Sequence, residues 1–260
     1  MDFPAVTAKK CFLIKKSKKL LKKVVENEDD DVKLSRTDLH GHGYHVVGAD
    51  FTDPKALETK LAECSVDFAC PTVFLAECVL VYVSPAKTDA FLSWALSKFA
   101  SPSATGSSTP IPTPLAFLNH EQIHMNDRFG AVMLDNLSAR GCGLPGVSAC
   151  VDKQTQIRRF LGAKSMLVSQ QSDSDSEAST SSALKEEGTV ASSWHRWDSA
   201  LCWTMSEIYN ELLPRDEVAR VESLEMFDEK ELMRQLFDHY CLTIAWRNGR
   251  DILFDDIEFW

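Results

Sequence analysis

This 260-residue sequence has no surplus of basic residues: 28 Lys and Arg stand against 38 Asp and Glu, which leaves a formal net charge of -10. A face that binds nucleic acid needs a surplus of positive charge, so this balance argues against a general nucleic-acid-binding protein. The sequence also contains no signal-peptide pattern and no long apolar run. We therefore expect neither secretion nor a membrane partner.

The eight cysteines include no Cys-x-x-Cys pair and no Cys/His spacing typical of a zinc site. We therefore expect reduced thiols and no metal, in a protein of the cytoplasm, with the nucleus as the alternative. No internal repeat is present, which excludes a propeller or a solenoid. With 44% hydrophobic and 25% charged residues, the composition is that of an ordinary globular protein with a sizeable core.

The most informative segment is the apolar run 71–83, Pro-Thr-Val-Phe-Leu-Ala-Glu-Cys-Val-Leu-Val-Tyr-Val, which we expect to contain a fully buried strand. Glu77 stands at the end of that strand, where a carboxylate is costly to bury without a partner. Ligands of open α/β sheets bind outside the carboxyl ends of the strands, so Glu77 is a candidate ligand contact. The alternative is an acid that caps the following turn, and the pattern leaves both open.

The order of apolar segments predicts alternating strands and helices, hence a parallel α/β sheet. The first part of the chain predicts a strand over 44–49 that ends at Asp50, a helix over 54–63, a strand over 73–76, a helix from Pro85, and a strand over 115–119. Further helices are expected over 127–139, 147–161, 205–212, 215–223 and 229–239. The apolar segment 240–246 is expected to be an antiparallel edge strand.

Two segments, 100–114 and 169–193, are rich in Ser and Pro or in Ser and acids, and we expect flexible, low-complexity insertions there. The run 9–23 carries eight lysines among apolar residues at helical spacing, which predicts a lysine-rich surface helix. A nuclear-localisation patch or a docking site for an acidic partner is the alternative.

Three blocks then become recognisable: Ala-Glu-Cys-Val-Leu-Val-Tyr at 76–82, Asp-Arg-Phe-Gly at 127–130 and Arg-Val-Glu-Ser-Leu-Glu at 220–225. In this order they resemble the leucine carboxyl methyltransferases, which use S-adenosylmethionine to methylate the C-terminal leucine carboxylate of the catalytic subunit of protein phosphatase 2A. The resemblance implies a class I methyltransferase, an α/β Rossmann-like doubly wound sheet with an antiparallel last strand. It implies a single domain over 1–260, that cofactor, and the phosphatase subunit as partner.

The resemblance also assigns cofactor-binding residues. Asp2 matches the acid that ends the second strand and holds the ribose hydroxyls, Asp50 with Phe51 matches a pair beside the adenine, and Glu77 matches an acid close to the cofactor. The family's first strand and glycine-rich loop have no counterpart in this sequence. We therefore expect an N-terminally incomplete domain, from a partial gene model or a natural truncation.

Methyl transfer to a carboxylate needs no general base, because a carboxyl group is already ionised at neutral pH. Positioning of the two reactants then accounts for the catalysis. Tyr82, just past Glu77, is the candidate donor that orients the carboxylate, with a half-buried sheet-end aromatic as the alternative. Arg128 is the basic candidate on the substrate side, with a surface ion pair as the alternative.

Two other functions are weighed. A chain without the glycine-rich loop could dock on the phosphatase without catalysing methyl transfer. A tRNA-modifying methyltransferase of the wybutosine pathway resembles this sequence in its methyltransferase domain, but the acidic charge and the lack of a repeat-built propeller speak against it. We expect a monomer, because no heptad pattern calls for a partner.

Overall fold

The computed structural model describes residues 1–25, 32–99, 113–162, 196–226 and 228–248. The chain divides into two compact units, Met1–Phe68 and Ala69–Trp260, and the expectation of one domain stays a prediction. The predicted insertion 169–193 lies outside the described residues, as does the insertion 100–114 except for its last two residues, which are buried. Among the described residues, no helix is long and apolar enough to cross a membrane.

The first unit combines three helices with a small antiparallel sheet of order β1-β2-β3. Its elements are α1 (Pro4–Lys16), α2 (Lys18–Leu21), β1 (Lys33–Leu34), β2 (Leu39–His40), β3 (His45–Val46) and α3 (Pro54–Glu63). The strand predicted over 44–49 is therefore shorter than expected and is antiparallel to its neighbour. The reason is the turn before it, where the amide of Gly41 donates to the carbonyl of Tyr44 at 3.0 Å and folds the chain back as a hairpin.

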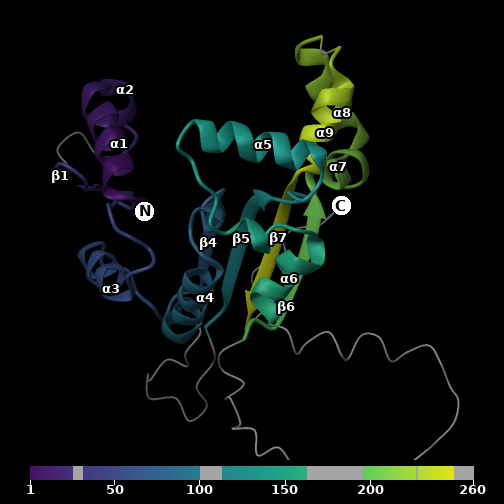
Figure 1. The fold of residues 1–260 in the computed structure, drawn as a ribbon. Coiled ribbons are helices and arrows are strands. Elements are labelled where there is room, and N and C mark those ends of the chain that lie inside the picture. Colours follow the sequence, from purple (N-terminus) through teal and green to yellow (C-terminus); the bar gives the residue numbers. More distant parts are fainter. Residues whose placement is uncertain (26–31, 100–112, 163–195, 227, 249–260) are drawn as a thin grey trace, which may run out of the picture. The chain divides into compact units, whose positions relative to one another are not determined.

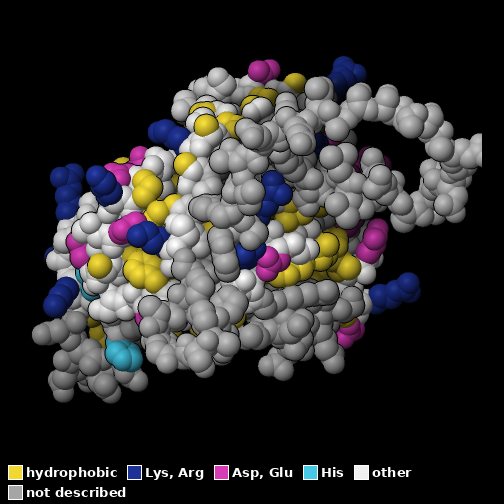
Figure 2. Space-filling model, turned by 90° about the horizontal axis from the view of Figure 1, so that it is seen from below, with side chains coloured by type: hydrophobic (Ala, Val, Ile, Leu, Met, Phe, Trp, Pro, Cys, Tyr) yellow, Lys and Arg dark blue, Asp and Glu magenta, His cyan; other side chains and the backbone are white. Residues whose placement is uncertain are grey.

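The lysine-rich segment is helical, as predicted, but the helix begins at Pro4 and breaks at Ser17, whose hydroxyl caps α2. Its inner face buries Cys11 and Ile14 against Leu39 and Val46 of the hairpin, which makes α1 an amphipathic part of the core. The lysines lie on the exposed or half-exposed side of the helix. On the face shown in Figure 2, Lys and Arg side chains are interspersed with Asp and Glu side chains.

The second unit is built on a four-stranded mixed sheet of order β4-β5-β7-β6 (Figure 1). Strands β4 and β5 are parallel, and β7 is antiparallel to both of its neighbours, which confirms the predicted α/β fold with an antiparallel last strand. Its elements are β4 (Thr72–Glu77), the 3-10 turn η1 (Leu80–Tyr82), α4 (Pro85–Phe99), β5 (Leu115–Gln122), α5 (Arg128–Ala139), the 3-10 turn η2 (Val147–Ala149), α6 (Lys153–Leu161), β6 (Ser199–Thr204), α7 (Met205–Glu207), the π-helical η5 (Ile208–Leu212), α8 (Arg215–Leu224), α9 (Lys230–Asp238) and β7 (Tyr240–Arg247).

Two predictions about these elements were wrong. Strand β7 is interior and not at the edge, because β6, which the sequence pattern did not reveal, pairs along its outer side from Ser199 to Thr204. The helix expected over 147–161 is interrupted, because Asp152 adopts extended backbone and its carboxylate accepts the amide of Thr155 at 2.6 Å, which starts α6 afresh.

The expectation that β4 is fully buried was also wrong. The exposed fractions of Val73 and Leu75 are 54% and 74%, and Glu77 is exposed as well. The alternation arises because side chains of a strand point to opposite faces in turn, and only the face of Phe74 packs against α4. The carboxylate of Glu77 therefore carries no burial cost.

An aromatic core fills the space between the sheet and the helices α4 and α6. Phe117 of β5 stacks on Phe74 with ring centroids 5.7 Å apart, and it also contacts Phe91 of α4 and Phe160 of α6. The exposed fraction of Phe117 is 1%. This packing holds β4 and β5 side by side and thereby sets where their carboxyl ends lie.

Candidate functional site

The candidate site of the second unit is the edge where the parallel strands β4 and β5 end, with Glu77 opposite His120 in the register. Cys78 follows at once with a φ of 49°, and His124 follows β5 with a φ of 57°. A positive φ is unfavourable for residues other than glycine, and residues with this conformation are frequent at functional sites. The amide of Cys78 donates to the carbonyl of His120 at 2.7 Å, which holds this turn against β5.

The thiol of Cys78 is not set up as a nucleophile. Burial, with Glu121 and Glu77 nearby, raises its pKa to about 11, so the group stays protonated at neutral pH. Its sulfur lies 3.9 Å from Nδ1 of His120, whose ring stacks on Tyr240 with centroids 5.3 Å apart. Cys78, His120 and Tyr240 thus pack together at the strand ends.

Glu121 is the buried acid of this edge, and the sequence analysis missed it. Its Oε2 accepts the amide of Val81 at 2.9 Å and lies 3.6 Å from Nη1 of Arg159. The side chain is fully buried, and this burial raises its pKa to about 7 in spite of the arginine. Because it holds η1 through Val81, Glu121 positions the segment that carries Tyr82. Residues 119–122, Asn-His-Glu-Gln, are all polar, so no local signal in the sequence marked Glu121 as buried.

Tyr82 lies at the end of η1 with 42% of its surface exposed. Burial, together with Cys142 and Cys78, raises the pKa of its hydroxyl, so the group stays a hydrogen-bond donor at neutral pH. The turn is also held by Gly146, whose amide donates to the carbonyl of Val81 at 2.9 Å. A Cβ at Gly146 would lie only 2.7 Å from the carbonyl oxygen of Val83, so only glycine permits this approach.

The block 127–130 forms the start of α5. The carboxylate of Asp127 accepts the amide of Gly130 at 2.7 Å and lies 3.0 Å from Nε2 of His239, which ties the helix to the end of α9. The hydrogen bond from Gly130, together with His239, lowers the pKa of Asp127. Arg128 is exposed in the first helical turn and forms no ion pair with an acid among the described residues.

Asp127→Ala is expected to lower the free energy of unfolding by about 1–2 kcal/mol, because it removes the cap of α5. The loss is fully present above the ordinary carboxyl pKa and disappears as the pH falls through the lowered pKa of the folded state. Urea unfolding at pH 7 and at pH 3 measures both values. Asp135→Ala, at an exposed acid in the same helix, is the control and should change little. Equal losses in the two variants would contradict the capping role.

In the first unit, Asp2 forms a parallel bridge with Gly48. The amide of Asp2 donates to the carbonyl of Val47 at 3.2 Å, and the amide of Ala49 donates to the carbonyl of Asp2 at 2.9 Å. Asp2 and Asp50 therefore stand at the ends of two paired, parallel segments. Glycine is required at 48, because a Cβ there would lie 2.7 Å from the hydroxyl of Thr7 in α1.

Each of these two acids uses one carboxylate oxygen locally. Oδ1 of Asp2 accepts the amide of Phe3 at 2.7 Å, and Oδ1 of Asp50 accepts the amide and the hydroxyl of Thr52, both at 2.8 Å. The ring of Phe51 contacts that of Phe3, with centroids 6.0 Å apart. Two exposed carboxylates beside aromatic rings fit a nucleoside, because carboxylates accept sugar hydroxyls and an aromatic face packs on a base.

The candidate residues are thus distributed over the two units. Asp2, Asp50 and Phe51 lie in the first, and Glu77, Tyr82 and Arg128 lie in the second. Their roles in binding stay predictions.

Comparison with known proteins adds the decisive observation. The family model "Leucine carboxyl methyltransferase" matches residues 1–96, and the chain is 32% identical over all 260 residues to leucine carboxyl methyltransferase 1 of Rattus norvegicus. This chain is a relative of the leucine carboxyl methyltransferases. The enzyme of Caenorhabditis elegans is 34% identical over 253 residues, or 94% of this chain. The chain spans 64% of the rat protein and 61% of the nematode protein, less than two thirds of either.

A second group of relatives is more distant. tRNA wybutosine-synthesizing protein 4 of Rattus norvegicus is 27% identical over 253 residues, which is 97% of this chain and 30% of that protein. The predicted resemblance to the leucine carboxyl methyltransferases is therefore confirmed, and with it relationship to a methyltransferase family. The family model covers all the candidate residues except Arg128.

Proposed function

We propose that this chain transfers a methyl group from S-adenosylmethionine to the C-terminal leucine carboxylate of the protein phosphatase 2A catalytic subunit. One observation carries the proposal. The segment matched by the family model brings Glu77, exposed, to the carboxyl end of a parallel strand pair, followed by left-handed backbone at Cys78 and a hydroxyl donor at Tyr82. This is the edge at which open α/β sheets bind their ligands.

The acids and the aromatic ring account for cofactor binding in this proposal. Asp2 accepts the ribose hydroxyls, Asp50 and Phe51 hold the adenine, and Glu77 lies close to the cofactor. S-adenosylmethionine, when bound, supplies a methyl group on a positively charged sulfur. The carboxylates are negatively charged and attract the positive sulfur. Because they are exposed, the protein pays no desolvation penalty for them.

The substrate side needs orientation and no proton transfer. A leucine carboxylate is ionised at neutral pH and attacks without help from a base. Tyr82 donates a hydrogen bond that orients it, and Glu121, through Val81, keeps η1 in place for this. Arg128, exposed at the start of α5, attracts the carboxylate. We further propose that the chain acts in the cytoplasm, with the nucleus as the alternative, as the cysteine spacing led us to expect.

Calorimetry tests the cofactor sites. S-adenosylmethionine should bind the full chain, and Glu77→Ala or Asp50→Ala should weaken its affinity by more than about tenfold, because each removes a charged contact worth about 1.4 kcal/mol or more. Asp135→Ala, which removes an exposed acid of α5, should leave the affinity unchanged. Affinities that stay equal in all three variants would reject the assignment of these residues.

Methyl incorporation tests the substrate. With labelled S-adenosylmethionine, the phosphatase catalytic subunit should take up label, and the subunit without its terminal leucine should not. Tyr82→Phe and Arg128→Ala should lower incorporation while the affinity for the cofactor stays unchanged. Binding of the phosphatase without incorporation would instead support the docking module. Label on tRNA alone would support the activity named for the wybutosine relatives.

A further inference from the structure

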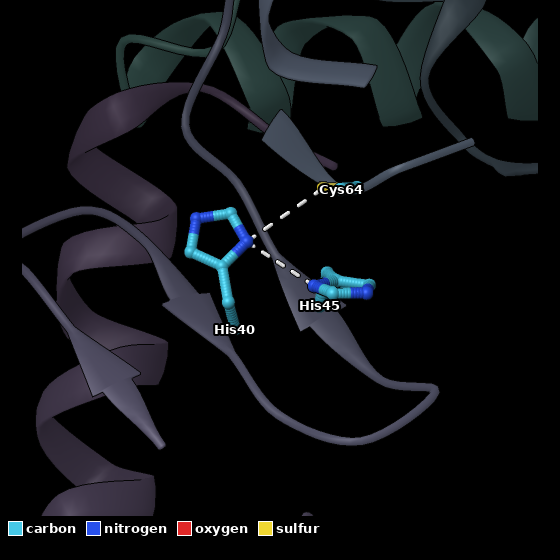
Figure 3. A group of neighbouring side chains, drawn as sticks. All are labelled: His40, His45 and Cys64. Carbon is cyan, nitrogen blue, oxygen red and sulfur yellow. Dashed lines mark hydrogen bonds between the residues drawn. The ribbon is translucent and has the colours of Figure 1, made fainter. Parts of the chain in front are cut away.

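Three potential metal ligands, His40, His45 and Cys64, meet in the first unit (Figure 3). Nδ1 of His40 lies 3.1 Å from Nδ1 of His45 and 3.8 Å from Sγ of Cys64. One ligand atom of each residue lies within 4.8 Å of the other two. All three side chains are half-buried, so they are held in place and remain open to an ion from solution.

The fold brings these residues together from three elements. His40 of β2 and His45 of β3 are direct partners across the hairpin, which places both side chains on the same face of the sheet. Cys64 ends α3, where Ser65 follows with a φ of 56° and stops the helix. The contacts depend on the hairpin register and on the length of α3. The three residues therefore form no recognisable metal-binding motif in the sequence.

The separations match a tetrahedral zinc site. With Zn–N bonds of about 2.0–2.1 Å and Zn–S bonds of about 2.3 Å, tetrahedral geometry puts two nitrogen ligands roughly 3.3 Å apart and a nitrogen and a sulfur ligand roughly 3.6 Å apart. The values of 3.1 Å and 3.8 Å differ from these by only a few tenths of an ångström. A metal could thus enter with small side-chain rotations.

The electrostatic surroundings also suit a cation. Cys64 lies at the carbonyl end of α3, where the helix dipole favours positive charge.

We propose that His40, His45 and Cys64 form a zinc-binding site that joins the β2–β3 hairpin to the end of α3. The two imidazoles and the thiolate supply three ligands, and a water molecule takes the fourth position. In the metal-bound state the ligand nitrogens carry no proton, and the Cys64 thiol releases its proton to solvent when zinc binds. This proposal replaces the expectation of a chain without metal.

Cobalt titration of the full reduced chain provides the test, because a Co²⁺–thiolate bond gives a charge-transfer band in the near ultraviolet. The band should saturate at one Co²⁺ per chain, and Zn²⁺ should displace it. Cys64→Ser should abolish the band, and His40→Ala or His45→Ala should each weaken Co²⁺ binding at least about tenfold. Cys142→Ser and His42→Ala, which alter an exposed cysteine and the histidine of the hairpin turn, are matched controls that should change neither.

Thermal unfolding gives a second measurement that does not depend on methyl transfer. Zn²⁺ should raise the Tm of the wild-type chain, EDTA should reverse the rise, and Cys64→Ser should remove it while its Tm without metal stays near that of the wild type. Circular dichroism checks that each variant is folded. A cobalt band that persists in Cys64→Ser, or no binding below millimolar metal, would overturn the proposal and leave the three groups as a hydrogen-bonded cluster.

Discussion

Replacing Phe117 by alanine should lower the free energy of unfolding of the second unit by about 4 kcal/mol, the largest loss that we expect from a single substitution. The side chain is 1% exposed and contacts aromatic rings on β4, α4, α6 and the segment before β6. Truncation removes these contacts and leaves a cavity that a rigid sheet and two helices cannot close.

Urea unfolding followed by tryptophan fluorescence measures this loss, because all six tryptophans lie in the second unit. Phe117→Leu keeps most of the volume and should cost clearly less than the alanine variant. Val132→Ala, at a residue of α5 that is 59% exposed, is the surface control in the same unit and should change stability by less than about 0.5 kcal/mol. A loss below about 1 kcal/mol for Phe117→Ala would show that this aromatic cluster is not the core.

The stability of the second unit should fall as the pH rises from about 4.5 to about 7, because of Glu121. Its pKa is raised from 4.5 to about 7 in the folded protein, so over this range the unfolded chain has lost the proton that the folded protein still holds. Fewer protons bound in the unfolded state mean that stability decreases with pH. A shift of this size corresponds to about 3 kcal/mol, fully present below the unfolded pKa and lost once the folded carboxyl ionises.

Glu121→Gln separates this effect from other titrating groups. The glutamine side chain is uncharged at every pH, and its oxygen can still accept the backbone N–H of Val81. The free energy of unfolding of the variant should therefore rise relative to that of the wild type as the pH increases to about 7. Urea unfolding at pH 5, 6, 7 and 8 gives the difference. A difference that does not vary with pH would mean that the pairing with Arg159, 3.6 Å away, keeps the carboxylate ionised throughout.

The helices could be predicted well because their signals are local. Helix α3, over 54–63, begins at a proline that follows the capping residue Asp53. Helix α5 likewise follows a capping aspartate, Asp127. The break between η2 and α6 was missed although Asp152 is the same kind of cap, because the apolar spacing runs across it. Strand β6 was missed because its residues, Ser-Ala-Leu-Cys-Trp-Thr, follow a Ser-rich segment and include no Val or Ile.

Sheet order, exposure and side-chain clusters could not be predicted, because they depend on pairing between distant residues. Whether β7 is interior depends on β6 reaching its outer side, some forty residues earlier in the chain. Glu77 and Glu121 are both acids near the ends of strands, yet one is exposed and the other fully buried, because η1 and α6 cover Glu121 through Val81 and Arg159.

The resemblance to the leucine carboxyl methyltransferases, most of the helices and three of the four strands of the second unit could be predicted from the sequence, since caps, turns and hydrophobic periodicity involve only a few neighbouring residues. The tertiary structure decided which acid is buried beside η1, and it brought His40 and His45 of a hairpin to the cysteine that ends α3. These outcomes depend on strand register and helix packing, which act between residues that the chain itself keeps far apart.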